Sequence, residues 1–194
     1  MKTILRIDSS IGSEGSISRT YGDLFEKYWK RKYDDTKFLY RDLDDIKQFR
    51  PYGPDDNPFS KASRNKSLLG CSDLLFEEIR QSDIIMVTCP KYKFDIPPSL
   101  KSYFEHIVWL NSTFQNHSNG YNGILKNKDA YLITSMDERK VNPEIPELFE
   151  KYLMTTLQFM GIENIQILSL HGTASTGFMK NQEQLYLEKL KQCI

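Results

Sequence analysis

The fold is decided by residues 83–107, DIIMVTCPKYKFDIPPSLKSYFEHI. The part from Asp83 to Cys89 is almost continuously apolar and is bounded by polar residues, which is typical of a strand buried on both faces of a sheet. Pro90 ends this strand, and Pro98 fits the first turn of a following helix. Apolar residues then recur at helical spacing, at Leu100, Tyr103, Phe104, Ile107 and Val108. The segment therefore predicts a buried strand, a proline-rich loop and an amphipathic helix.

The same alternation extends to both sides of this segment. Apolar runs predict four further strands, at residues 2–8, 37–43, 128–135 and 164–170. Amphipathic patterns predict helices at residues 16–31, 72–80, 147–160 and 181–193, and a polar, proline-containing connection covers 44–67. Strands that alternate with helices form parallel βαβ units. We therefore expect one α/β domain over residues 1–194, a flavodoxin-like, doubly wound, five-stranded parallel sheet of order 2-1-3-4-5 with helices on both faces.

The composition excludes several classes of protein. The 26 basic and 26 acidic residues cancel to a net charge of +0, which argues against nucleic acid or an anionic membrane as a partner and favours self-association. Three widely spaced cysteines, Cys71, Cys89 and Cys193, indicate neither a disulfide framework nor a metal site. No segment approaches the roughly 18 apolar residues of a membrane span, and the first residues do not resemble a secretory signal. We therefore expect a cytoplasmic protein without bound metal.

The loop after the first strand is rich in serine. Ligands of such sheets bind at the carboxyl ends of the strands, so the loops after Asp8, Cys89 and Ser135 are the candidates. Residues 9–18, SSIGSEGSIS, precede a helix whose N–H groups and dipole favour a phosphate. Ser16 can equally be a simple helix N-cap, and both interpretations stay open. The chain contains neither GxxxxGK[ST] nor GxGxxG, the common nucleotide signatures.

The loop after the third strand, residues 90–98, has the sequence PKYKFDIPP. Two aromatic residues between prolines can form a rigid wall against a planar ligand, and two lysines can balance negative charge on it. Alternatively, the loop is a proline-stiffened turn whose aromatic residues cover the sheet edge while its lysines lie in solvent. Composition alone favours this second interpretation.

Two segments together resemble the FMN-dependent NADH-azoreductase family, the flavodoxin-like quinone reductases. They are residues 1–20, MKTILRIDSSIGSEGSISRT, and residues 90–114, PKYKFDIPPSLKSYFEHIVWLNSTF. In this family the second segment begins with the pattern P-M-Y-N-F-x-I-P. The residues that carry the match are Pro90, Tyr92, Phe94, Ile96, Pro97, Leu100, Lys101, Phe104 and His106. The resemblance covers essentially the whole chain.

The resemblance implies an FMN site built from three loops. The first loop would hold the phosphate, with Ser9, Ser10, Ser16, Ile17 and Ser18. The loop after the third strand would run along the isoalloxazine, with Pro90, Lys91, Tyr92, Lys93 and Phe94. The loop after the fourth strand would approach the flavin from the other side, with Ser135, Met136, Asp137 and Glu138.

Four of these residues depart from the family pattern. Lys91 and Lys93 stand where the family has Met and Asn, and Asp137 and Glu138 stand where it has a glycine pair. Contacts made through backbone N–H groups survive such changes, whereas contacts made through side chains do not. Glycine also permits a close backbone approach that a residue with a Cβ atom does not.

The resemblance implies an enzyme that uses FMN and NADH or NADPH to reduce quinones and azo compounds in a two-electron, ping-pong hydride transfer. In such an enzyme the cofactor carries the chemistry, so we expect no catalytic side chain and no metal. The family also implies a homodimer with the flavin at the subunit interface, and the apolar helix around Trp109 is a candidate dimer surface. The alternative is a divergent flavin-binding or regulatory protein with little reductase activity, which the four departures motivate.

Overall fold

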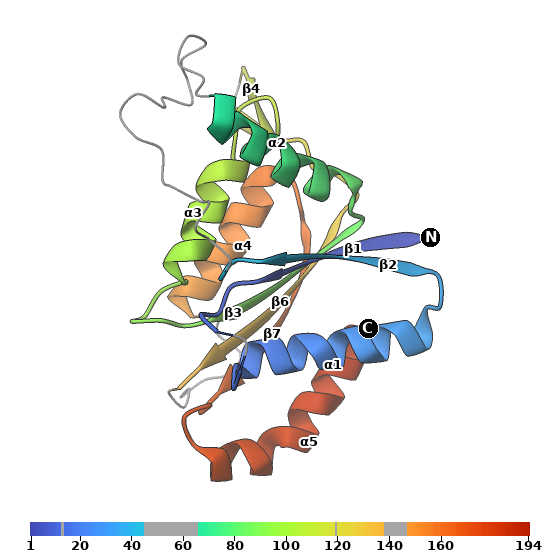
Figure 1. Cartoon of the computed structure of the whole chain (residues 1–194), viewed down its shortest axis with the longest axis vertical. Coiled ribbons are helices and arrows are strands. Elements are labelled where there is room, and N and C mark those ends of the chain that lie inside the picture. Colours follow the sequence, from blue (N-terminus) through green and yellow to red (C-terminus); the bar gives the residue numbers. More distant parts are fainter. Residues whose placement is uncertain (13, 45–65, 119, 138–146) are drawn as a thin grey trace.

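The strands of the main sheet follow the predicted order. The computed structural model describes residues 1–12, 14–44, 66–118, 120–137 and 147–194. Five parallel strands pair in the order β2-β1-β3-β6-β7, which equals 2-1-3-4-5 when only these strands are counted (Figure 1). They are β1 (Lys2–Asp8), β2 (Thr36–Asp42), β3 (Ile84–Pro90), β6 (Asp129–Met136) and β7 (Asn164–His171). The predicted flavodoxin-like sheet is therefore confirmed.

Helices cover both faces of this sheet. Figure 1 shows α1 (Ile17–Lys32) and α5 (Thr176–Cys193) on one side, and α2 (Lys66–Gln81), α3 (Pro98–Ile107) and α4 (Leu148–Met160) on the other. Successive side chains of a strand point to opposite faces. In β3, Ile84 and Met86 accordingly pack toward α1 and α5, whereas Ile85 and Val87 pack toward the other three helices.

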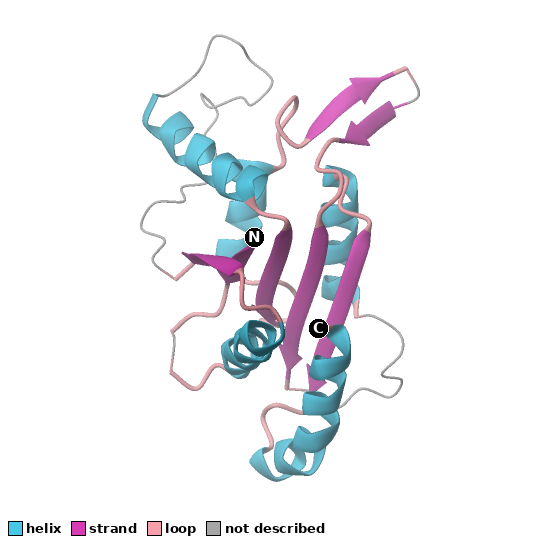
Figure 2. Cartoon of the chain, turned by 90° about the vertical axis from the view of Figure 1, so that its right-hand side faces the viewer, coloured by secondary structure: helices cyan, strands magenta, loops and turns pink. Residues whose placement is uncertain are grey.

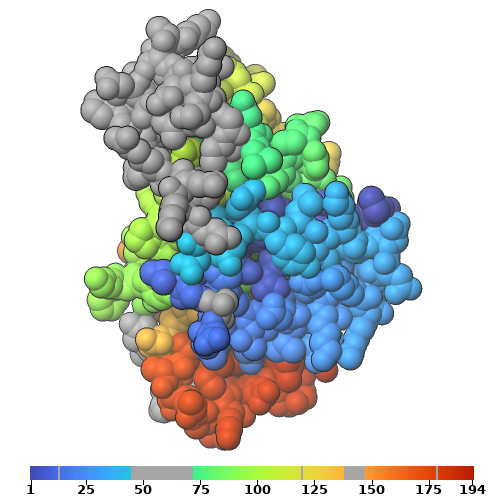
Figure 3. Space-filling model, viewed as in Figure 1, coloured from blue at the N-terminus to red at the C-terminus, as the bar shows by residue number. Residues whose placement is uncertain are grey.

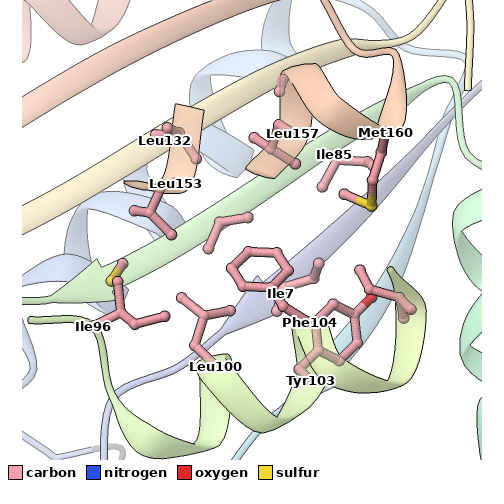
Figure 4. Packing of buried hydrophobic residues seen from close by; sticks show 14 of the residues in the cluster. Ile7, Ile85, Ile96, Leu100, Tyr103, Phe104, Leu132, Leu153, Leu157 and Met160 are labelled. Carbon is pink, nitrogen blue, oxygen red and sulfur yellow. The ribbon is translucent and has the colours of Figure 1, made fainter. Parts of the chain in front are cut away.

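The larger core lies beneath α3 and α4. Leu100, Tyr103 and Phe104 of α3 meet Leu153 and Leu157 of α4 over the strands (Figure 4). All five side chains are buried. Because these apolar positions fix the orientation of α3, they also fix the loop that leads into it from β3.

A small hairpin lies outside the predicted pattern. Strands β4 (Phe114–His117) and β5 (Gly120–Gly123) pair antiparallel, and Figure 2 shows them beyond the amino-terminal ends of the main strands. Three of the four residues in each strand are exposed, so neither strand has an apolar run that the sequence could reveal. The candidate loops follow the carboxyl ends of the main strands, so the hairpin lies at the opposite end of the sheet from the candidate site.

Two helix starts were predicted too late. Helix α2 begins at Lys66 rather than at residue 72, and α5 begins at Thr176 rather than at residue 181. The first turns contain polar residues and glycine, so apolar residues do not recur there at helical spacing and the sequence gives no signal of the helix start. Most of the polar connection predicted at 44–67 lies outside the described residues. Among the described helices, none combines the length and the hydropathy that crossing a bilayer requires.

Candidate functional site

The loops after β1, β3 and β6 meet at the carboxyl ends of the strands. The N–H of Lys91 donates to the carbonyl oxygen of Ser135 at 2.7 Å. The N–H of Ile11 donates to the phenol oxygen of Tyr92 at 3.2 Å. In Figure 3 the blue surface of the first loop accordingly lies beside the light-green surface of the segment that follows β3. The three loops singled out from the sequence are thus contiguous in space.

The start of α1 combines a helix cap with a set of hydrogen-bond donors. Ser16 is the N-cap, and its Oγ accepts from the N–H of Arg19 at 3.4 Å. The buried hydroxyl of Ser18 lies 3.3 Å from the hydroxyl of Ser16. Gly12 and Gly15 have φ values of 73° and 75°, a left-handed conformation that glycine adopts without strain. The capping role is confirmed, and the same first turn offers N–H groups that a helix cannot satisfy internally.

The two serines at the end of β1 have different tasks. The hydroxyl of Ser9 donates to the carbonyl oxygen of Thr88 at 2.8 Å, so it ties β1 to β3. The hydroxyl of Ser10 accepts from Nε of Arg19 at 2.5 Å. Both serines are almost fully buried. Ser9 therefore shapes the loop, whereas Ser10 belongs to a polar network inside it.

Arg19 is a component of the site that the sequence analysis missed. Its Nη1 and Nη2 each lie 2.6 Å from a carboxylate oxygen of Asp42, at the end of β2, and Nη2 also donates to the carbonyl oxygen of Ser10 at 2.8 Å. These hydrogen bonds raise the pKa of Arg19 and hold the pKa of Asp42 below its usual value. The partners are far apart along the chain, so a single sequence gives no sign that they pair.

The loop after β3 contains a tight turn in an uncommon backbone conformation. Tyr92 and Asp95 exchange two backbone hydrogen bonds, of 2.8 and 3.0 Å. Between them, Lys93 and Phe94 have φ values of 49° and 73°, the double left-handed pattern of a type I′ turn. Phe94 is 77 % exposed at the tip, and Nζ of Lys91 lies 5.5 Å from the centre of its ring. Tyr92 thus faces the first loop, whereas Phe94 projects away from the protein.

The left-handed conformation of Lys93 predicts a stabilising substitution. Asn tolerates this conformation better than other residues with a Cβ atom, so Lys93→Asn is expected to raise the free energy of unfolding by about 0.5–1 kcal/mol. Urea denaturation of the two proteins measures the difference. Lys91→Asn is the matched control, because the structure gives Lys91 no positive φ, and it should bring no gain. An equal gain in both variants would contradict the conformational explanation.

The loop after β6 contributes its backbone and one exposed carboxylate. Ser135 and Met136 are buried, and the carbonyl oxygen of Met136 accepts from the N–H of Thr173 at 3.1 Å. The carboxylate of Asp137 accepts from the hydroxyl of Thr173 at 3.0 Å. Asp137 is therefore held by the loop after β7, while Glu138 lies outside the described residues.

A buried carboxylate on α4 accepts hydrogen bonds from side chains near the end of β6. Oε1 of Glu150 accepts from the hydroxyls of Thr134 and Ser169 at 2.6 and 2.7 Å, and Oε2 accepts from the N–H of Glu147 at 2.7 Å. Glu150 has no exposed surface. Its contact with the N–H of Glu147 is a local capping box at the start of α4, but its two hydroxyl partners come from two strands and follow no local pattern.

Replacing Glu150 is expected to cost stability. Glu150→Ala leaves the buried hydroxyl of Thr134, the half-buried hydroxyl of Ser169 and a backbone N–H without their acceptor, so the free energy of unfolding should fall by about 3 kcal/mol. Glu150→Gln retains an acceptor for the hydroxyls and should cost less than half as much. Thermal and urea unfolding measure both variants. A loss in Glu150→Ala no larger than in Glu150→Gln would show that these hydrogen bonds are not what stabilises the strand end.

Comparisons with known proteins agree with this architecture. The family model described as "Flavodoxin-like fold" matches residues 2–193. An FMN-dependent NADH:quinone oxidoreductase of Francisella philomiragia subsp. philomiragia is 36% identical over 178 residues, covering 89% of this chain and 88% of the relative. A protein of the same name from Photorhabdus laumondii is 31% identical, covering 100% of this chain and 99% of the relative.

Solved structures show the same fold at lower identity. The FMN-dependent NADH-azoreductase of Bacillus anthracis str. Ames Ancestor, solved in complex with FMN, is similar with a TM-score of 0.84 at 19% identity, covering 100% of this chain and 99% of that one. Another azoreductase, from Bacillus anthracis str. Sterne, has a TM-score of 0.80 at 16% identity, covering 99% of this chain and 96% of that one. The chain therefore belongs to the flavodoxin-like family that includes the FMN-dependent NADH:quinone oxidoreductases.

Proposed function

We propose that this protein is an FMN-dependent NAD(P)H oxidoreductase that reduces quinones and azo compounds. The observation that carries the proposal is the meeting of three loops at one sheet edge, in a chain whose relatives are named as such enzymes. The donor set fits the cofactor. Backbone N–H groups at the start of α1 and the hydroxyl of Ser16 suit a phosphate, while the buried hydroxyl of Ser18 lies behind that of Ser16. The loops after β3 and β6 offer backbone and aromatic surface to a planar ring.

The role of the protein in this proposal is to bind and orient. The two-electron chemistry between NAD(P)H and the acceptor would be supplied by the bound FMN. Ser10 and the first turn of α1 would hold the phosphate, while residues 91–94 and 135–137 would flank the ring. The type I′ turn keeps Lys93 and Phe94 at the edge of this site, and the bond from Thr173 keeps the carboxylate of Asp137 directed toward β7. No side chain is needed as a nucleophile or general base.

We also propose a cytoplasmic homodimer with the flavin at the subunit interface. A groove of 290 Å³ runs between α3 and α4, and its apolar wall includes Phe104, Val108, Tyr152 and Phe159. Such a surface between two helices suits a second copy of the chain. The described cysteines, Cys89 and Cys193, have free thiols, as is usual for cytoplasmic proteins. Sedimentation at micromolar concentration should give twice the mass of one chain, and Val108→Glu should reduce it to that of one chain. A monomeric parent protein would contradict the dimer.

A steady-state assay tests the proposed activity. Protein stripped of flavin should oxidise NADH with a simple benzoquinone only after FMN is added. Dependence on FMN with no response to riboflavin would further support a phosphate subsite. Flavin that stays bound without any NADH oxidation would instead support the alternative of a divergent flavin-binding or regulatory protein with little reductase activity, which the four departures from the family pattern motivate.

A further inference from the structure

We propose that Arg19 is a positioning residue that makes Ser10 a hydrogen-bond donor for the phosphate of FMN. This inference rests on the proposed FMN binding and adds a residue to it. Arg19 is only 7% exposed although it carries a charge, and it lies in the first turn of α1. Burying a charged guanidinium costs free energy of desolvation, and the contacts of Arg19 must offset that cost. These contacts therefore indicate what Arg19 does.

Arg19 fixes both polar groups of Ser10. Its Nε donates to the hydroxyl oxygen at 2.5 Å, and its Nη2 donates to the carbonyl oxygen at 2.8 Å. A guanidinium has only donors, so the hydroxyl of Ser10 must accept from it. The single hydroxyl hydrogen is then free to point elsewhere. Among the described residues, this hydrogen has one acceptor, the carbonyl oxygen of Gly12, at the long distance of 3.3 Å.

A phosphate would be a better acceptor for this hydrogen. Hydrogen bonds to ionised oxygens are shorter and stronger than those to neutral carbonyls. Ser10 lies in the same loop as the capping Ser16, at the positive end of α1, where an anion is favoured. Ser10 is only 2% exposed, so a phosphate oxygen reaches the hydroxyl when the carbonyl of Gly12 moves aside, while Arg19 continues to hold the hydroxyl from the protein side.

Asp42 keeps Arg19 in this position. Its carboxylate accepts two parallel hydrogen bonds of 2.6 Å from the guanidinium, and Asp8 lies 3.8 Å from the same group. Asp8 is itself paired with Arg6, so Asp42 is the carboxylate that balances the positive charge, and Arg19 acts through Ser10 and not as a free cation for the ligand. A lysine cannot contact Ser10 Oγ, Ser10 O and both oxygens of Asp42 at once, because it lacks the planar fork.

The ratio of the FMN and riboflavin affinities tests this inference. Riboflavin has the ring of FMN but no phosphate, so a phosphate subsite appears as tighter binding of FMN. Arg19→Gln is expected to reduce this preference roughly tenfold, chiefly by weakening FMN. Ser10→Ala should reduce it by a similar factor, and the double variant should lose little more than either single one. Quenching of flavin fluorescence measures the affinities.

The controls separate positioning from a general loss of structure. Arg41→Gln breaks an ion pair with Glu78 on the other face of β2, and it should leave the preference unchanged. If Arg19→Gln does not fold, Arg19→Lys keeps the buried charge and should still lower the preference. An unchanged preference in the Arg19 variants, or losses that add in the double variant, would overturn the role of Arg19. Failure of the parent protein to bind either flavin would instead overturn the proposed function.

Discussion

Ser16→Asp is expected to weaken FMN binding about 100-fold while the protein stays as stable as the parent. Aspartate caps a helix as well as serine does, and its charge interacts favourably with the helix dipole. The same carboxylate would lie beside the phosphate of FMN. A repulsion of about 2.8 kcal/mol, which is reasonable for charges a few ångströms apart near a protein surface, corresponds to this loss. Flavin fluorescence titration and urea unfolding measure the two effects separately.

The neutral substitution at the same position is the control. Ser16→Asn also caps the helix but carries no charge, so it should bind FMN within a few-fold of the parent. Riboflavin should bind alike to the Asp and Asn variants, because it has no phosphate to repel. If Ser16→Asp binds FMN as tightly as Ser16→Asn does, the phosphate does not lie at the start of α1.

Gly123→Ala is expected to lower the free energy of unfolding by about 3 kcal/mol. Gly123 ends the hairpin strand β5 and lies directly against the end of α4, where Gly161 has a φ of 105°. A Cβ atom on Gly123 would overlap the backbone of Met160 and Gly161. Backbone atoms cannot move aside as a flexible side chain can, so the hairpin must shift and the core contacts of α4 loosen. Urea unfolding monitored by circular dichroism measures the change.

Gly177→Ala is the control for this prediction. Gly177 lies near the start of α5, and a Cβ atom there would meet nothing within 4 Å. Alanine is also the better helix former, so this variant should be equal to the parent or slightly more stable. A loss of less than about 1 kcal/mol in Gly123→Ala would contradict the close packing of β5 on α4.

The sheet could be predicted because its strands are covered on both faces. All seven residues of β3 are buried, and such a strand is visible as an apolar run without any partner being known. The hairpin could not be predicted, because most of its residues face solvent and its position depends on the contact between Gly123 and Gly161. That contact joins segments that are distant along the chain.

The candidate site could be predicted in outline but not in its polar network. Parallel strands end at one edge, so the loops with Ser10 and Tyr92 had to come close together. The long-range contacts of the carboxylates and the guanidinium beneath them follow no local pattern. Arg19 and Asp42 are 23 residues apart, and Glu150 reaches hydroxyls on β6 and β7. Pairs of this kind become visible only when the packing is known.

The visible spectrum of the purified protein, before and after addition of NADH without oxygen, tests the central claim most directly. The account predicts a yellow protein, or one that becomes yellow and more heat-stable with FMN, whose flavin absorbance bleaches with NADH and returns when a quinone is added. A colourless protein that neither retains FMN nor is stabilised by it would contradict the account. A bound flavin that NADH leaves oxidised would contradict the reductase activity.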